Sequence, residues 1–209
     1  MSLKKTLKRR KKFKISRSLG FSILENKKEF SRGKKRMTPP GMHGDKKRRK
    51  SSYSLQKNEK KKICFLYGMK EKQLYNTFAK LKSGKGSIGD NLLINCESRI
   101  DNLIFRSGIV GTRKLARQFV SHGHFLLDGK KAKTPSLKVD PGQVITLKKE
   151  EMSNNNLIRE SLERNSKVPS YLEFNRQNLS IKFVRYPVND ELNKEINVPL
   201  AVEWYNRKV

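Results

Sequence analysis

The chain has few acidic residues, few cysteines and no long apolar run. Of its 209 residues, 19 are Asp or Glu and 2 are Cys. Cys64 and Cys96 are too far apart for a paired-cysteine zinc site, so we expect two buried thiols in a reducing compartment, with no zinc and no other cofactor. No apolar run approaches the ~20 residues that a membrane-spanning helix needs, and the N-terminus lacks the apolar core of a secretory signal. We therefore expect an intracellular protein without a membrane span; the basic start leaves an organellar transit peptide open.

Positive charge is what the sequence has in excess. Its 49 Lys and Arg residues give a formal net charge of +30, far more than solubility requires. Nucleic acid is the expected partner of such a chain, and an anionic membrane surface is the alternative. The excess is uneven: residues 1–62 hold 24 basic and 4 acidic side chains, residues 63–149 hold 16 and 6, and residues 150–209 hold 9 and 9. We expect phosphate to meet the first two segments and other proteins to meet the last.

Residues 97–149 have the pattern of a compact unit of two helices and a small sheet. Three- and four-residue spacing predicts the buried side of the first helix, formed by Ile100, Leu103, Ile104 and Ser107. Arg99 and Arg106 fall on another face of the same pattern. Thr112 is suited to cap the start of a second helix, and Gly123 is suited to end it.

The second helix is expected to have one apolar and one basic face. The buried residues are Leu115, Ala116, Phe119 and Val120, and the other face carries Arg113, Lys114, Arg117 and Ser121. A helix N-terminus offers free N–H groups and a positive dipole end to a phosphate. Asp128-Gly129 then predicts a hairpin with lysines on its return strand, and residues 144–147 have strand composition. One basic face alone is often only solvated surface, but two basic helices and a basic hairpin together favour RNA.

The flanking segments carry weaker signals. Residues 1–50 hold too many like charges to form a core alone, so we expect a basic tail that becomes ordered against phosphate. Residues 51–82 have helical periodicity, with Tyr67 expected in the core, and residues 84–89 are expected to be a linker.

The C-terminal residues predict three further elements. A short helix is expected over 154–165, with Leu157, Ile158, Ser161 and Leu162 facing inward. Residues 179–186 alternate as a strand that is expected to extend the sheet. Pro199 suits the start of a last helix over 200–205, and we expect this helix to pack on residues 51–82.

Several runs in the central unit resemble the small RNA-binding module named after ribosomal small-subunit protein four. They are residues 97–102, 112–124, 128–130 and 139–143. The similarity extends over nearly the whole chain to the family of bacterial-type ribosomal small-subunit protein four. It continues through residues 40–44, 67–68, 89–92, 168–169 and 202–205. Some family members carry a cysteine-ligated zinc near the N-terminus; the cysteines for it are missing here, which agrees with a zinc-free protein.

The resemblance implies an α+β fold with an inserted module. Residues 1–50 would form a basic extended N-terminal tail, and residues 51–96 a helical domain completed by residues 187–209. The module would cover residues 97–158, as two packed helices with a small, largely antiparallel sheet. Residues 159–186 would supply the helix and strand that join the module to the helical domain.

The predicted RNA-binding residues are basic, aromatic or polar side chains of these segments. In the module they are Arg99, Arg106, Thr112, Arg113, Lys114, Arg117, Gln118, Ser121, His122, His124, Lys130, Lys131 and Lys133. In the tail and the first long helix they are Arg17, Arg32, His43, Arg48, Arg49, Tyr53, Lys57, Lys60 and Lys61. No catalytic or metal-binding residue is expected.

The resemblance implies a non-enzymatic, structural constituent of the small ribosomal subunit in the cytoplasm. Such a protein binds small-subunit ribosomal RNA directly, nucleates assembly of the subunit body and contributes to translational accuracy. Its implied neighbours are ribosomal small-subunit proteins three and five, with messenger RNA nearby. A free RNA chaperone and an RNA-modifying enzyme are the alternatives that carry the same module. An enzyme would need a separate catalytic domain, for which the remaining residues leave no room.

Overall fold

The described residues form two compact units. The computed structural model describes residues 12–27, 30, 38–44, 49–84, 86–148, 156–164 and 168–207. Among these, the residues up to Tyr75 and those from Glu195 on form unit 1, and the residues from Asn76 to Lys194 form unit 2. Residues 76–96, which the sequence groups with the helical domain, share their contacts with the module instead.

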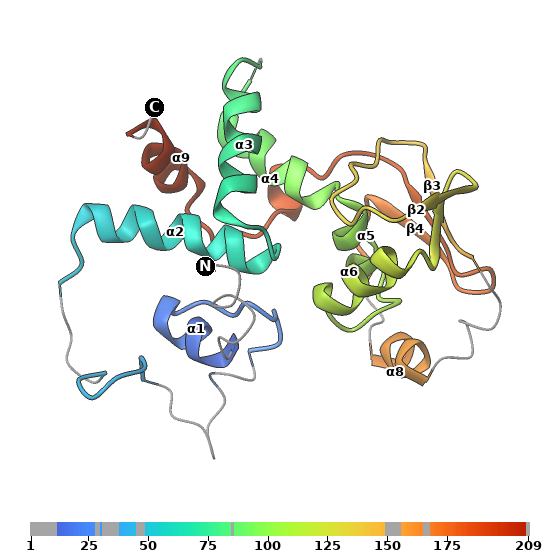
Figure 1. Ribbon diagram of the computed structural model, residues 1–209, viewed down its shortest axis with the longest axis horizontal. Helices are drawn as coiled ribbons and strands as arrows, with labels where there is room; N and C mark the ends of the chain where they lie inside the picture. The colour runs from blue at the N-terminus through green and yellow to red at the C-terminus, as the bar shows by residue number, and fades with distance from the viewer. Residues whose placement is uncertain are drawn as a thin grey trace, which may run out of the picture. The chain divides into compact units, whose positions relative to one another are not determined.

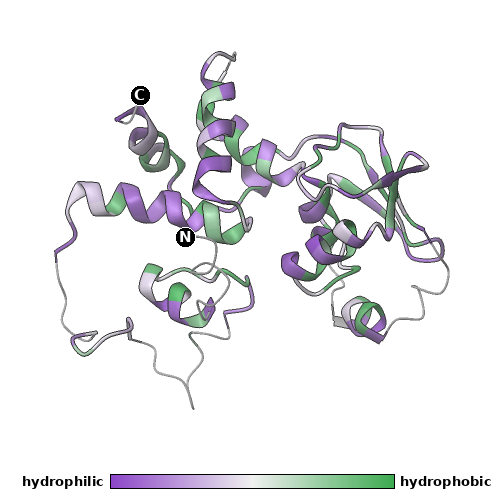
Figure 2. Cartoon of the chain, in the orientation of Figure 1, coloured by the Kyte–Doolittle hydropathy of each residue, from purple (hydrophilic) through white to green (hydrophobic). Residues whose placement is uncertain are grey.

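Unit 1 is built from helices (Figure 1). It contains α1 (Lys12–Leu19), α2 (Ser52–Leu66), the start of α3 (Glu71–Lys82) and α9 (Val198–Asn206). Along α2 a hydrophilic stretch is followed by hydrophobic residues at the C-terminal end (Figure 2), where Ile63, Cys64 and Leu66 are buried.

Part of the expected extended tail is folded. α1 buries Leu19, and Phe21 and Ile23 directly after it are also buried. The hydroxyl of Ser16 accepts a hydrogen bond from the backbone N–H of Ile23 at 3.3 Å, which holds this segment against the helix. A few apolar residues therefore order a stretch whose composition is dominated by like charge.

The C-terminal helix α9 packs on α2, as its apolar residues predict. The rings of Tyr53 and Trp204 lie 4.7 Å apart, and the Gln56 side-chain amide donates a hydrogen bond to the Glu203 carboxylate at 2.7 Å. Tyr67 is buried in this unit, as expected. Two helices that are far apart in the sequence thus contribute to one core.

A helix that the sequence did not predict, α4, covers Ile88–Glu97. The Ser87 hydroxyl caps it by accepting a hydrogen bond from the backbone N–H of Asp90 at 3.4 Å. The expected linker over residues 84–89 therefore ends inside a helix. Gly89 lies in the first turn of α4 and weakens the local helix signal, because glycine is a poor helix former.

Both cysteines are buried, as the sequence predicts. Burial raises the pKa of the Cys64 thiol to about 11, so the thiol stays protonated at neutral pH. A protonated, buried thiol is a poor nucleophile and a poor metal ligand. These residues behave as small apolar side chains in the core.

Unit 2 combines helices with a small antiparallel sheet, which confirms the predicted α+β class. Its first two module helices are α5 (Ile100–Arg106) and α6 (Arg113–His122). The strands are β1 (Phe125–Leu127), β2 (Lys130–Ala132), β3 (Val144–Leu147), β4 (Leu172–Asn175) and β5 (Ser180–Phe183). They lie in the order β2-β1-β3-β5-β4, and each neighbouring pair is antiparallel. β5 is the predicted extra strand, and β4 was not predicted.

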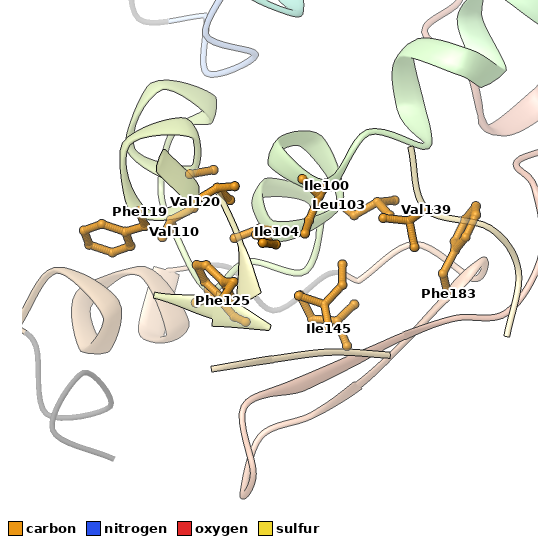
Figure 3. Close-up of a cluster of buried hydrophobic side chains, with 14 of the residues drawn as sticks. Ile100, Leu103, Ile104, Val110, Phe119, Val120, Phe125, Val139, Ile145 and Phe183 are labelled. Carbon is orange, nitrogen blue, oxygen red and sulfur yellow. The ribbon is translucent and has the colours of Figure 1, made fainter. Parts of the chain in front are cut away.

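The core of unit 2 lies where α5 and α6 meet one face of the sheet. Figure 3 shows side chains of α5 and α6 close to Phe125 and Ile145 of the sheet. The predicted inward residues of α5 are all buried: Ile100, Leu103, Ile104 and Ser107. The correct period for a helix thus identified the buried face of α5 from the sequence.

A further helix, α8 (Asn156–Arg164), also contributes to this core. Ile158 and Ser161 are buried, as predicted. Leu157 was expected to face inward, and this is wrong because 49% of it is exposed. A nine-residue helix that contacts the core through Ile158 and Ser161 turns the residue before Ile158 toward solvent.

An ion pair fixes the segment that follows β5. Arg185 donates hydrogen bonds from two nitrogens to the Glu191 carboxylate at 2.8 and 2.7 Å, and Ser170 also donates to it. Glu191 ends the short 3-10 helix η2 (Asn189–Glu191) and accepts from the backbone N–H of Val188 at 2.9 Å. The bonds from Arg185 and Ser170 lower the pKa of Glu191 to about 2.

This depressed pKa predicts an acid-sensitive segment. The ionised carboxylate is preferred in the folded state, so its contribution to stability is complete above the ordinary carboxyl pKa of about 4.5 and disappears as the pH falls toward 2. We expect the protection factors for amide hydrogen exchange at residues 185–191, which correct for the intrinsic pH dependence of exchange, to fall over this range, and Glu191→Gln to abolish that fall. A Glu191 carboxyl that titrates near 4.5 by NMR would contradict the pairing.

Candidate nucleic-acid interface

Helix α6 presents polar and basic side chains beside a capped N-terminus. The Thr112 hydroxyl accepts a hydrogen bond from the backbone N–H of Leu115 at 3.2 Å, and Gly123 ends the helix with φ +74°, as predicted. Lys114 and Gln118 are exposed on this helix. The remaining N–H groups of the first turn and the positive end of the helix dipole favour an anion at this point.

The hairpin brings lysines to the C-terminal end of the same helix. Asp128 and Gly129 both have positive φ and form the predicted tight turn, with Leu127 paired to Lys130. Ala132 faces the core, so Lys131 and Lys133 on either side of it face outward. A Cβ atom on Gly123 would collide with the side chain of Lys131, so the end of α6 and the hairpin lysines are neighbours.

The charges of these lysines act on one another. Lys148, which follows β3, and Lys133 together lower the pKa of Lys131, with a smaller contribution from burial. Like charges held this close repel each other unless an anion lies between them. This group, Lys131, Lys133 and Lys148, is the lysine cluster of the module.

Two histidines extend the polar surface at the end of α6. His122 is exposed, and its ring centroid lies 5.9 Å from that of His124. His124 is half-buried and packs edge-on to Phe119 at 5.7 Å. Ser121 is exposed, and its hydroxyl donates to the backbone carbonyl of Arg117 at 2.9 Å. The predicted polar residues of α6 are therefore brought together with the hairpin.

The prediction that Arg99 lies on an outward face is wrong. Arg99 is only 5% exposed and donates to both carboxylate oxygens of Asp101, at 3.0 and 2.7 Å. The residue precedes α5 and has extended backbone, with a bridge to Lys138. The helical period that assigned its face does not apply to a residue outside the helix.

Arg106 and Arg113 are tied to a buried acid next to the core. Arg106 donates to both oxygens of Glu97, at 3.2 and 2.8 Å. Asn102 donates to the same carboxylate at 2.5 Å and accepts at its side-chain oxygen from Nε of Arg113 at 2.7 Å. The Arg113 guanidinium also lies over the ring of Phe105, 4.4 Å from the centroid.

Arg117 on α6 approaches the other buried acid. Its Nε lies 3.6 Å from the Asp101 carboxylate, and about a third of the side chain is exposed. Burial lowers the pKa of this arginine, the neighbouring Asp101 raises it, and Arg99 lowers it. The guanidinium is therefore held at the edge of the core, with part of it in solvent.

The sequence interpretation missed the acids beneath the arginines. Glu97, Asp101 and Asn102 are all buried, although acids rarely lie inside unless they are paired. The signal available was two acids among the basic residues of 97–117. Burial of Tyr171 and the negative charge of Glu97 raise the pKa of Tyr171, whose hydroxyl donates to that carboxylate at 3.4 Å.

In unit 1, the candidate residues are more scattered. Lys60, which was predicted to bind RNA from α2, is not on the surface of this unit. It is 3% exposed, pairs with Glu71, and its ammonium lies 4.8 Å from the centre of the Trp204 ring. This position of α2 faces α9, and an aromatic face and a carboxylate offset the burial of the charge. Tyr53 packs on Trp204 yet stays 53% exposed, with Lys57 over its ring. Lys61 is half-buried.

The candidates near the N-terminus lie on the surface of the described residues. His43 and Arg49 are exposed. The Arg17 guanidinium donates to the backbone carbonyls of Phe13 and Thr38 at 3.4 and 3.5 Å. Arg32 and Arg48 lie outside the residues that the structure describes.

In unit 2, two helices pack on a small antiparallel sheet, and the second helix and a hairpin carry basic side chains. This arrangement defines the class of small RNA-binding modules, which recognise structured RNA through its backbone and shape. The sequence-family model of the S4 domain matches residues 98–145 of this chain. The family model of the ribosomal protein S4/S9 N-terminal domain matches residues 8–97. The chain is 52% identical over 200 residues to small ribosomal subunit protein uS4 of Mesoplasma florum, covering 94% of this chain and 96% of that protein. It is 44% identical over 196 residues to uS4 of Geobacillus kaustophilus, covering 93% and 96%. The chain belongs to the family of small ribosomal subunit protein uS4.

The described part of the chain lacks two further features. No helix there is both long and apolar enough to cross a membrane. Within the same residues, no group of three or more His, Cys, Asp and Glu side chains is arranged to hold a metal ion. The expectation of a zinc-free protein stays a prediction.

The lysines on α6 and the hairpin predict a measurable salt dependence. If Lys114, Lys131 and Lys133 each contact a phosphate, replacing all three with Gln should lower the slope of log affinity against log salt concentration by about 3, because each lost contact releases one counterion less. The measurement is RNA affinity by filter binding across a salt series. Lys194→Gln, which removes an exposed lysine far along the chain, is the control and should leave the slope unchanged. An equal change of the slope in the triple variant and in Lys194→Gln would contradict an RNA interface at these lysines.

Proposed function

We propose that this protein is a structural component of the small ribosomal subunit that binds small-subunit ribosomal RNA directly through unit 2. The observation that carries the proposal is that the hairpin lysines lie beside the C-terminal end of α6, a helix with basic side chains, in a chain of the uS4 family. Lysines that repel each other at the lysine cluster gain most from a polyanion. The arginines beside them supply planar donors that suit phosphate groups.

The proposed mechanism is recognition of a folded RNA rather than of a base sequence. Phosphate contacts position a protein on RNA, while the fold of the RNA supplies the specificity. A protein that binds several RNA helices at once stabilises their arrangement by mass action. We therefore expect early binding during assembly of the subunit body, with no catalytic activity and no cofactor.

The C-terminal segment is proposed to meet proteins. Residues 150–209 hold as many acidic as basic side chains, which does not favour a polyanion. Following the family resemblance, the expected neighbours are ribosomal small-subunit proteins three and five, near the entering messenger RNA, in the cytoplasm. A role in translational accuracy belongs to the same proposal.

The RNA-binding role is tested by sedimentation and by footprinting. We expect the protein to co-sediment with small subunits through a sucrose gradient after a salt wash, because a structural component is part of the assembled subunit. Hydroxyl-radical footprinting on protein-free small-subunit RNA should show a compact protected region. A protein that stays at the top of the gradient would act as a free RNA chaperone, and this would contradict the proposal.

The protein-binding role predicts a division of crosslinks. In reconstituted subunits, a lysine-reactive crosslinker that joins proteins should capture Lys194 with neighbouring proteins, since it lies in the neutral segment. Lys114 and Lys131 should crosslink to RNA under ultraviolet light or formaldehyde. Crosslinks from Lys194 to RNA alone would contradict the assignment of partners.

A further inference from the structure

Two acids lie inside the most basic part of unit 2, directly beneath the arginines proposed to face RNA. Asp101 accepts two hydrogen bonds from Arg99 and lies 3.6 Å from Nε of Arg117. Glu97 accepts from Asn102, whose side-chain oxygen accepts from Nε of Arg113 at 2.7 Å. Arg117 thus contacts a buried carboxylate directly, and Arg113 is connected to one through the side-chain amide of Asn102.

We propose that Asp101 and the Glu97–Asn102 pair are positioning residues for RNA binding, which hold the guanidinium groups of Arg117 and Arg113 in the orientation that a phosphate requires. The inference rests on the proposed function and adds residues that do not touch RNA. Both guanidinium groups are contacted through Nε, the nitrogen nearest the main chain. A contact there restricts the rotation of the planar fork that presents the terminal nitrogens.

Arginines that are held in place before RNA binds reduce the entropy lost on binding. An arginine that is free to rotate loses much of its side-chain entropy when it grips a phosphate. A side chain that is already held in the folded protein loses less, so the same contact contributes more to affinity. The stacking of Arg113 on Phe105 acts in the same direction. Asp101 itself is kept in place by Arg99, which explains why a buried arginine lies in this network.

The sign of the effect separates positioning from simple electrostatics. Removing an acid from a protein that binds a polyanion should strengthen binding if only net charge matters. If Asp101 orients Arg117, its removal should weaken binding although the protein becomes more positive. Opposite expectations for one substitution make Asp101→Asn a decisive variant. Asn keeps the shape of the side chain and one acceptor for Arg99.

The test is a double-mutant cycle on RNA affinity at one salt concentration. The probe is an in vitro transcript of the small-subunit ribosomal RNA of Mesoplasma florum, the source of one of the similar proteins. The variants are Asp101→Asn, Arg117→Gln and their combination, with Lys114→Gln alone and combined with Asp101→Asn as the matched control. Asp190→Asn, which removes an exposed acid, controls for net charge.

We expect Asp101→Asn to weaken binding about tenfold, the size of one charge-assisted hydrogen bond, and to add nothing once Arg117 is Gln. Lys114→Gln should cost the same factor with and without Asp101→Asn, and Asp190→Asn should not weaken binding. Equal losses from Asp101→Asn in the presence and absence of Arg117, or stronger binding by Asp101→Asn, would overturn the inference. If the unsubstituted protein fails to bind the transcript, the proposed function fails, and the inference fails with it.

A second double-mutant cycle is used if a variant of the first cycle does not fold. Thermal unfolding of each variant shows whether it is folded. Removing one partner of a buried ion pair is strongly destabilising, so Asp101→Asn is compared only as folded protein. Where it does not fold, Asn102→Ser with Arg113→Gln forms the equivalent cycle without changing a buried charge. We expect Asn102→Ser to weaken binding about tenfold only while Arg113 is present. Independent effects in this cycle would overturn the inference.

Discussion

The packing of α5 against α6 and the sheet is the interaction on which unit 2 depends. The apolar stripe of α5 is buried completely, together with Val120, Phe125 and Ile145 from the surrounding elements. Burial of apolar area on this scale is the largest favourable contribution to a small fold. It also places the start of α5 and the preceding turn inside the protein, where every polar group must find a partner. The ion pairs of Arg99 and Arg106 follow from that requirement.

These ion pairs link the core to the proposed RNA surface. A buried carboxylate is costly unless it is paired, and here the pairs extend outward to the two arginines of α6. The same acids therefore satisfy the core and restrain side chains at the surface. At the lysine cluster, repulsion between like charges dominates. Arginines and lysines suit different tasks, because planar forks give geometric fit and point charges give attraction at a distance.

Unit 1 uses charge in another way. The ammonium of Lys60 is buried against Trp204 and Glu71, so a residue that counts toward the net charge of the chain contributes to a core instead. Residues far apart in the sequence meet here, since α2 packs on α9. The net charge of the chain therefore indicates the class of partner, but it does not indicate which basic side chains contact that partner.

The sequence by itself determined the elements that rest on local chemistry. Helical period identified the buried face of α5, Thr112 and Gly123 bounded α6, and Asp128-Gly129 specified the hairpin, because caps, turns and amphipathic spacing are decided within a few residues. The family and its basic character were also readable from the chain. Only the tertiary structure decided which basic residues are available: Arg99 and Lys60 look exposed by spacing and are buried by contacts with Asp101 and Trp204. The physical reason is that pairing between a charge and its partner depends on distance in space, and local periodicity contains no information on it.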